Sequence, residues 1–263
     1  NSVLKTEDII ENMASADIAE GQIFTRAALE AIRQGIQEVY SGRGRYGAAV
    51  DIEVEELPRN RVAIKLVVNE GEESRIRNIN IVGNKAFAEE DLLGLFELGT
   101  KPWYMIMSRK DRYSREQFTG DLERLESFYL DNGYVEFNID STPISITPDR
   151  KEVYITVDVT EGSQYVVSKV DLAGDLVDAE ALLRAAVFVR PGQIYSQGLV
   201  TGTEEIMVQF LGNLGYAFAE ATGVPEVNDE DETVEVTFFV EPGKRTYVNR
   251  IDFSGNLATA DDV

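Results

Sequence analysis

Residues 153–175 read VYITVDVTEGSQYVVSKVDLAGD, and this stretch decides the fold because the chain repeats it. The same pattern returns as VAIKLVVNEGEESRIRNINIVGN (62–84) and VEVTFFVEPGKRTYVNRIDFSGN (234–256). Aligned on Gly71, Gly162 and Gly243, the three copies carry apolar residues at every second position before the glycine. Such alternation is typical of a half-buried strand, and a second short strand follows each glycine. The chain is therefore predicted to consist of repeated units.

Two helical patterns lie between consecutive copies of this stretch. The first is short and acidic, NKAFAEEDLL from Asn84, and it resembles NSVLKTEDII at the start of the sequence. The second is longer, with apolar residues at offsets 0, +7 and +11, a spacing that keeps them on one helical face. These stripes are Leu29/Ile36/Tyr40, Phe118/Leu125/Tyr129 and Leu199/Ile206/Phe210. Each long helix is predicted to end at a glycine followed closely by tyrosine.

Each unit thus has the order strand–helix–helix–strand–strand, which predicts an α+β fold with two helices packed on a three-stranded mixed sheet. The predicted boundaries give units at 1–73, which lacks its first strand, 74–163 and 164–244, and the start of a further, truncated unit at 245–263. The last strand of one unit leads within a few residues into the first strand of the next. We therefore expect an elongated array with short junctions.

The composition excludes several classes of function. The 263 residues include 25 Lys and Arg against 47 Asp and Glu, a net charge of −22, which disfavours nucleic acid and anionic lipid as partners. Cysteine and histidine are absent, which removes thiol nucleophiles, Cys/His zinc sites and His-based triads. No apolar run approaches the roughly 18 residues of a transmembrane helix. We expect no enzyme activity, no cofactor and no metal.

The junction V-x-V-x-E-G … I-x-I-x-G-N and the terminal Gly-Tyr of the long helix resemble a POTRA domain. The segments IRNINIVGNKAFAEEDL, GDLERLESFYLDNGYVEFNIDSTPISITPD and YITVDVTEG are similar to the third POTRA domain of the BamA family of outer-membrane protein assembly factors. LPRNRVAIKLV is similar to the end of the second domain and PEVNDEDETVEV to the hairpin of the fourth. The resemblance covers the whole chain, from most of the second POTRA domain to the start of the fifth, and implies tandem POTRA repeats.

The resemblance also implies a function, a location and partners. It implies a scaffold arm, soluble in the periplasm of a Gram-negative bacterium, whose parent protein is anchored in the outer membrane by a C-terminal barrel that this sequence lacks. Its partners would be unfolded outer-membrane proteins and accessory lipoproteins, with a BamB-like lipoprotein at the middle domain. The alternative is a POTRA arm of a related polypeptide-transport or two-partner secretion pore that acts mainly as a spacer.

Three motifs have a functional and a structural interpretation. Gly42-Arg-Gly44-Arg-Tyr-Gly47 matches the dinucleotide fingerprint, but it closes a helix and opens a strand, so a helix C-cap is preferred. Asn228-Asp-Glu-Asp-Glu232 lacks the spacing of a calcium loop and is interpreted as a hairpin turn. The cluster Lys101–Met107 includes Trp103 and Tyr104, which either contact a partner or pack a longer helix–helix loop.

The most specific site prediction concerns Tyr134–Ile146, the strand that follows the long helix of the middle unit and is the longest of its kind by sequence. In the POTRA fold implied by the resemblance this strand lies at a sheet edge and the final strand is central, so its free backbone groups can pair with an extended partner. Apolar residues change parity around Asp140–Pro143, which indicates a bulge. The predicted contact residues are Phe137, Ile139, Asp140, Ile144 and Ile146.

Overall fold

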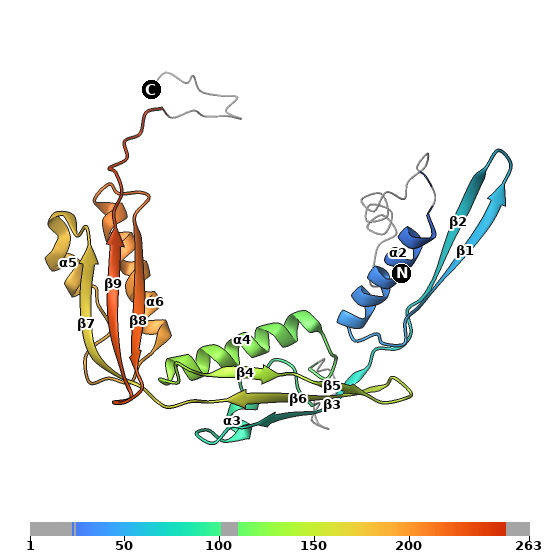
Figure 1. Ribbon diagram of the computed structural model, residues 1–263, viewed down its shortest axis with the longest axis horizontal. Helices are drawn as coiled ribbons and strands as arrows, with labels where there is room; N and C mark the ends of the chain where they lie inside the picture. The colour runs from blue at the N-terminus through green and yellow to red at the C-terminus, as the bar shows by residue number, and fades with distance from the viewer. Residues whose placement is uncertain (1–22, 24, 101–109, 251–263) are drawn as a thin grey trace, which may run out of the picture. The chain divides into compact units, whose positions relative to one another are not determined.

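The computed structural model describes residues 23, 25–100 and 110–250, drawn in colour in Figure 1. The chain divides into two compact units, the first formed by residues 1–126 and 138–161, the second by 127–137 and 162–263. Each unit is considered by itself. The order of elements follows the predicted repeat.

The first part of unit 1 contains one long helix and a hairpin. Helix α2 (Arg26–Gly42) is capped by Thr25, whose hydroxyl accepts a hydrogen bond from the Ala28 amide at 3.3 Å. Leu29, Ile36 and Tyr40 are buried, which confirms the predicted stripe. Strands β1 (Ala49–Leu57) and β2 (Arg61–Asn69) pair antiparallel along their whole length.

The second part of unit 1 contains the sheet on which the site prediction falls. Its strands are β3 (Arg75–Val82), β4 (Asn138–Ser141), β5 (Ile144–Ile146) and β6 (Glu152–Thr160). The sheet is mixed, because β6 is central, parallel to β3 and antiparallel to β4 and β5. The short helix α3 (Glu89–Leu93) and the long helix α4 (Arg115–Asp131) belong to the same repeat.

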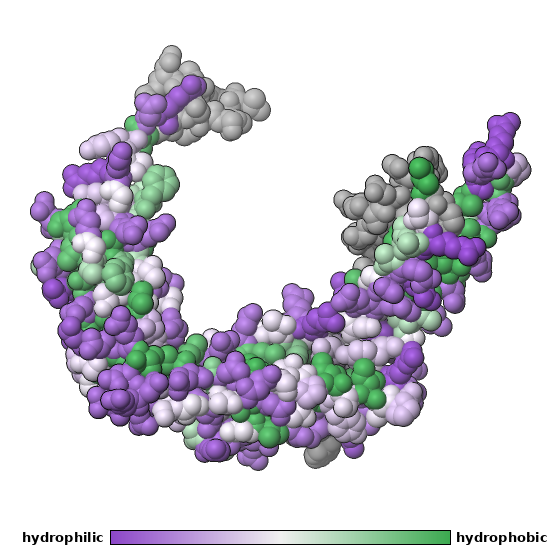
Figure 2. All heavy atoms as spheres, viewed as in Figure 1, coloured by the Kyte–Doolittle hydropathy of each residue, from purple (hydrophilic) through white to green (hydrophobic). Residues whose placement is uncertain are grey.

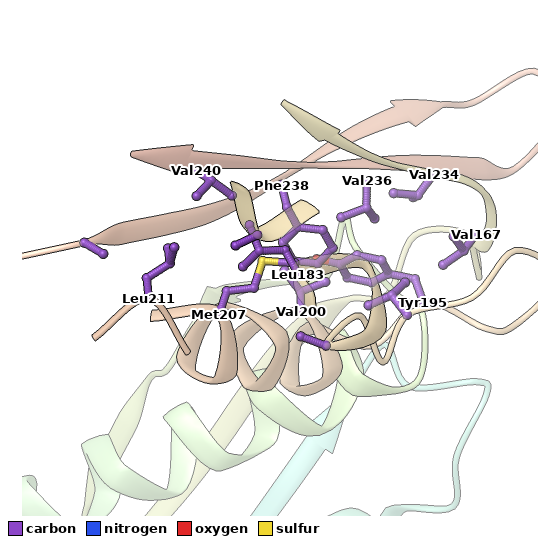
Figure 3. Close-up of a cluster of buried hydrophobic side chains, with 14 of the residues drawn as sticks. Val167, Leu183, Tyr195, Val200, Met207, Leu211, Val234, Val236, Phe238 and Val240 are labelled. Atoms are coloured by element: carbon purple, nitrogen blue, oxygen red, sulfur yellow. The ribbon is translucent and has the colours of Figure 1, made fainter. Parts of the chain in front are cut away.

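Unit 2 repeats this order with an uninterrupted edge strand. Strand β7 (Val166–Gly174) is followed by a 3₁₀ turn (Val177–Ala179), α5 (Glu180–Ala185), α6 (Gln197–Asn213), β8 (Glu220–Asn228) and β9 (Thr233–Glu241). Again the last strand is central, with β7 parallel and β8 antiparallel to it. Figure 3 shows its core, where Val234, Val236, Phe238 and Val240 meet side chains of α6.

The apolar stripe of α6 differs by one residue from the sequence prediction. Leu199 is 39% exposed, whereas Val200, Met207 and Leu211 are fully buried. Ile206 and Phe210 are only partly buried against the same core. Both sets follow the offsets 0, +7 and +11, so spacing alone could not separate them. A shift of one residue turns a helix by about 100°, and the sheet selects the face.

Three glycines follow the ends of the long helices and connect successive repeats. Gly44, Gly133 and Gly215 have φ of 72°, 88° and 97°, a left-handed conformation that favours glycine. Their carbonyl oxygens accept hydrogen bonds from the amides of Ser74, Tyr165 and Thr246 at 2.8, 2.8 and 2.9 Å. The helix C-cap interpretation of the glycine-rich motif is confirmed, since α2 ends at Gly42 and β1 follows at Ala49.

Candidate partner-binding edge

Strands β4 and β5 form one edge of the middle sheet. Both pair with β6 on one side, and among the described residues no strand pairs with their other side. The predicted position of this segment at a sheet edge is therefore confirmed. An edge of this kind offers backbone donors and acceptors to an added strand.

A bulge within β4 keeps the apolar residues of β4 and β5 on one face. The register against β6 shifts between Ile139 and Ser141, as the change of parity predicted. Ile139 is opposite Val159, and Ile144 and Ile146 are opposite Ile155 and Val153. Because directly paired residues share a face, all three isoleucines lie on the side of the sheet that carries the core.

The backbone of β5 has a defined outward set of groups. The Pro143 carbonyl accepts a hydrogen bond from the Thr156 amide at 3.1 Å, and the Thr147 amide donates to the Glu152 carbonyl at 3.0 Å. Because alternate residues of a strand direct their N–H and C=O to opposite sides, Ile144 and Ile146 direct theirs away from β6. These two residues present the main-chain groups that an added strand would pair with.

The side chains of the edge are partly accessible. Ile146 is 38% exposed and Ile144 is half-buried. Asp140 lies in the bulge, where its carboxylate accepts hydrogen bonds from Thr160 Oγ1 at 2.6 Å and Asn138 Nδ2 at 2.7 Å. These two bonds, that from Thr160 first, hold the pKa of Asp140 below its ordinary value. Asp140 therefore stabilises the bulge as a carboxylate.

The strand prediction is wrong at its beginning. Residues Tyr134–Phe137 form a turn closed by a hydrogen bond from the Phe137 amide to the Tyr134 carbonyl, and β4 starts at Asn138. Phe137 is 7% exposed and stacks on Tyr129 with ring centroids 4.1 Å apart. Its side chain fixes the start of the edge to the core. Trp103 and Tyr104 lie outside the described residues.

The edge is also shorter than predicted. Strands β4 and β5 have four and three residues, whereas the corresponding strands β1 and β8 have nine each. The bulge and Pro143 interrupt pairing in the middle domain. In β8, by contrast, Pro225 pairs with Val236 without a shift of register. An edge strand tolerates proline where the missing N–H would face away from the sheet. Length alone does not distinguish the middle edge.

The other motifs have structural roles in the described part of the chain. Residues 229–232 connect β8 to β9, and the Asn228 side-chain oxygen accepts from the Glu230 amide at 3.1 Å, which confirms a hairpin turn. No group of three acidic residues there is arranged to hold a metal ion.

None of the described helices is long and apolar enough to cross a bilayer. Figure 2 shows mostly hydrophilic residues on the drawn surface, with hydrophobic ones in small groups.

Comparison with known protein families assigns this fold to a family. The family described as "POTRA: Surface antigen variable number repeat" matches residues 1–71, 74–162 and 165–243. The chain therefore belongs to the POTRA family.

Individual similar proteins give a more specific comparison than the family model. The outer membrane protein assembly factor BamA of Neisseria meningitidis serogroup B is 30% identical over 262 residues, which cover 99% of this chain and 33% of that protein. BamA of Buchnera aphidicola is 30% identical over 264 residues, 100% of this chain and 43% of that protein. The crystal structure of POTRA domains 3–5 of Haemophilus influenzae BamA matches with a TM-score of 0.62 and 26% identity, over 72% of this chain and 74% of that one. The chain thus spans between a third and a half of the length of these two curated relatives.

Proposed function

We propose that this chain is a periplasmic arm of the outer-membrane β-barrel assembly machinery. The proposed arm binds unfolded outer-membrane proteins and accessory lipoproteins by adding their extended segments to its sheet edges. The similarity to BamA along the whole chain supports the assembly role. The open edge of β4 and β5 carries the binding proposal, because its outer backbone groups have no strand partner among the described residues.

The proposed contact on the middle domain is centred on Ile144 and Ile146. An added strand would pair with their outward N–H and C=O groups, and the exposed part of Ile146 would contact its side chains. Asp140 and Ile139 shape the bulge at one end of this contact. Phe137 positions the edge from within the core.

The first experiment titrates the chain with the BamB-like lipoprotein and compares Ile144→Arg, Ile146→Arg with the unmodified protein. The bulky cations should obstruct docking and weaken the affinity at least about tenfold, as loss of a central contact does. Val208→Arg is the matched control, because Val208 is an exposed aliphatic residue on helix α6 and belongs to neither β4 nor β5. Circular dichroism verifies the fold. Equal affinity of the double variant and the control would move the site elsewhere.

A second variant separates backbone pairing from side-chain contact. Ile146→Pro removes one outward N–H and keeps the ladder to β6, whose bonds come from Pro143 and Thr147. Peptides from outer-membrane strands are added, and amide NMR shifts are recorded along β4 and β5. Weaker binding by Ile146→Pro is the result expected of strand addition. Unchanged shifts would show that the main chain of β5 takes no part.

A further inference from the structure

The sheet of unit 2 has a second face that none of the described helices covers. In β9 the residues Val234, Val236, Phe238 and Val240 point toward α6, as Figure 3 shows. The alternate residues of β9 therefore point away from the helices. We call this surface the outer face; it is formed by Glu235, Thr237, Phe239 and Glu241 of β9 with their paired neighbours on β7 and β8.

An aromatic side chain stands at the centre of the outer face. Phe239 is 46% exposed although it lies on the central strand. Its neighbours across the strands are Thr222 and Ala173, which are too small to cover the ring. Val224, diagonal to it on β8, is 40% exposed. Phe239 and Val224 together form an apolar contact point surrounded by small residues.

Two pairs of glutamates flank this contact point. Glu220 lies directly opposite Glu241, and Glu226 directly opposite Glu235. Like charges opposite each other on one face destabilise a sheet, so each pair has a cost in the free protein. Glu220, Glu226 and Glu241 form no ion pair with another described residue.

One cation lies on the outer face, and carboxylates already hold it. Lys169 Nζ is 2.6 Å from an Asp171 oxygen and 4.0 Å from a Glu235 oxygen. The ion pair with Asp171 and the charge of Glu235 raise the pKa of Lys169. The face as a whole therefore remains strongly negative and would attract positive charge.

The matching face of the middle domain shows that the fold does not require this arrangement. Counted back from Gly162 and Gly243, Asp158 occupies the repeat position of Phe239. Asp158 accepts a hydrogen bond from the Ser141 hydroxyl across the strands. At that position one repeat carries a satisfied polar group and the next carries an exposed phenylalanine between two pairs of glutamates.

We propose that the outer face binds an extended cationic segment of a partner protein. An aromatic or aliphatic side chain of the segment packs against Phe239 and Val224, and a Lys or Arg side chain meets each glutamate pair. Glu235 and Glu241 are six residues apart on β9, which corresponds to about 20 Å. The partner therefore carries two basic residues about six positions apart with apolar residues between them. Charge repulsion disfavours anionic lipid and a second copy of this chain, whose net charge is −22.

The test uses the full 263-residue chain and a synthetic seven-residue peptide with arginine at both ends and phenylalanine and valine in its middle. Fluorescence anisotropy measures the affinity, and amide NMR shifts locate the peptide. We expect shifts on β7, β8 and β9, and an affinity that falls with added salt, because the ionic contacts are exposed. Phe239→Asp, which copies the middle domain, should weaken binding at least about tenfold. Phe188→Asp, at an equally exposed phenylalanine whose amide donates to Thr203 of α6, should leave it unchanged.

Two further sets of measurements test the ionic contacts and the apolar contact separately. A peptide with glutamate ends should not bind, and one with arginine ends and a Gly-Ser middle should bind less tightly. The variant Glu220→Gln, Glu241→Gln removes one like-charge pair, so it should fold at least as stably while losing affinity. The proposal is overturned if no peptide binds, if peptides with arginine and glutamate ends bind equally, or if Phe239→Asp binds like the unmodified chain.

Discussion

Leu199 and Leu211 are the same residue type on the same helix, yet their side chains differ in burial. Leu211 is fully buried in the core of unit 2, and Leu199 is 39% exposed. The sequence spacing favoured Leu199, because the apolar character of α6 extends around both candidate faces. At this scale the burial of a residue depends on the sheet that it meets.

This pair gives a direct prediction for stability. Leu211→Ala should lower the free energy of unfolding of unit 2 by about 2–5 kcal/mol, because it removes a side chain packed in a closed core. Leu199→Ala on the same helix should change it by no more than about 0.5 kcal/mol. Chemical denaturation followed by far-ultraviolet circular dichroism measures both. Similar losses for the two variants would contradict the assigned face.

At the scale of elements, the sequence predicted the presence of strands better than the residues at which they begin. Alternation in residues 153–159 and 234–240 was sufficient to place β6 and β9, because every second residue there is buried. The bulge was also predictable, since the parity of the isoleucines changes across Asp140–Pro143. The start of β4 was not, because stacking of Phe137 on Tyr129 is a tertiary contact that periodicity does not contain.

Gly133, which follows the end of α4, offers a test of how this helix is connected to the next repeat. A Cβ at Gly133 would lie 2.7 Å from Ile194 Cγ2 and 2.9 Å from the Tyr165 carbonyl oxygen. Its φ of 88° also disfavours other residues, so Gly133→Ala should destabilise unit 2 by about 1–3 kcal/mol. Gly212→Ala is the control, because a Cβ there meets no atom within 4 Å inside a helix. It should be neutral or stabilise by up to about 1 kcal/mol; calorimetry that ranks the two variants in the opposite order would refute this role for Gly133.

At the scale of the whole molecule, the repeats predict an extended particle. The proposed domains 1–73, 74–163 and 164–244 are joined by short segments, and the same carbonyl-to-amide hydrogen bond recurs after each long helix. A compact body of this length would have a radius of gyration of roughly 18 Å. Small-angle scattering should give a clearly larger value. A measured radius near the compact value would contradict the array.

The order of strands has a mechanical consequence. In unit 2 the chain enters the sheet at the start of β7 and leaves it at the end of β9, and these two strands are parallel neighbours. Opposite pulls on the two ends would therefore slide β9 along β7 and load all hydrogen bonds between them at once. Strands β3 and β6 have the same arrangement. Tension from a tethered, partly folded chain would meet shear resistance in each of these sheets, not the bond-by-bond opening of a hairpin pulled apart from its ends.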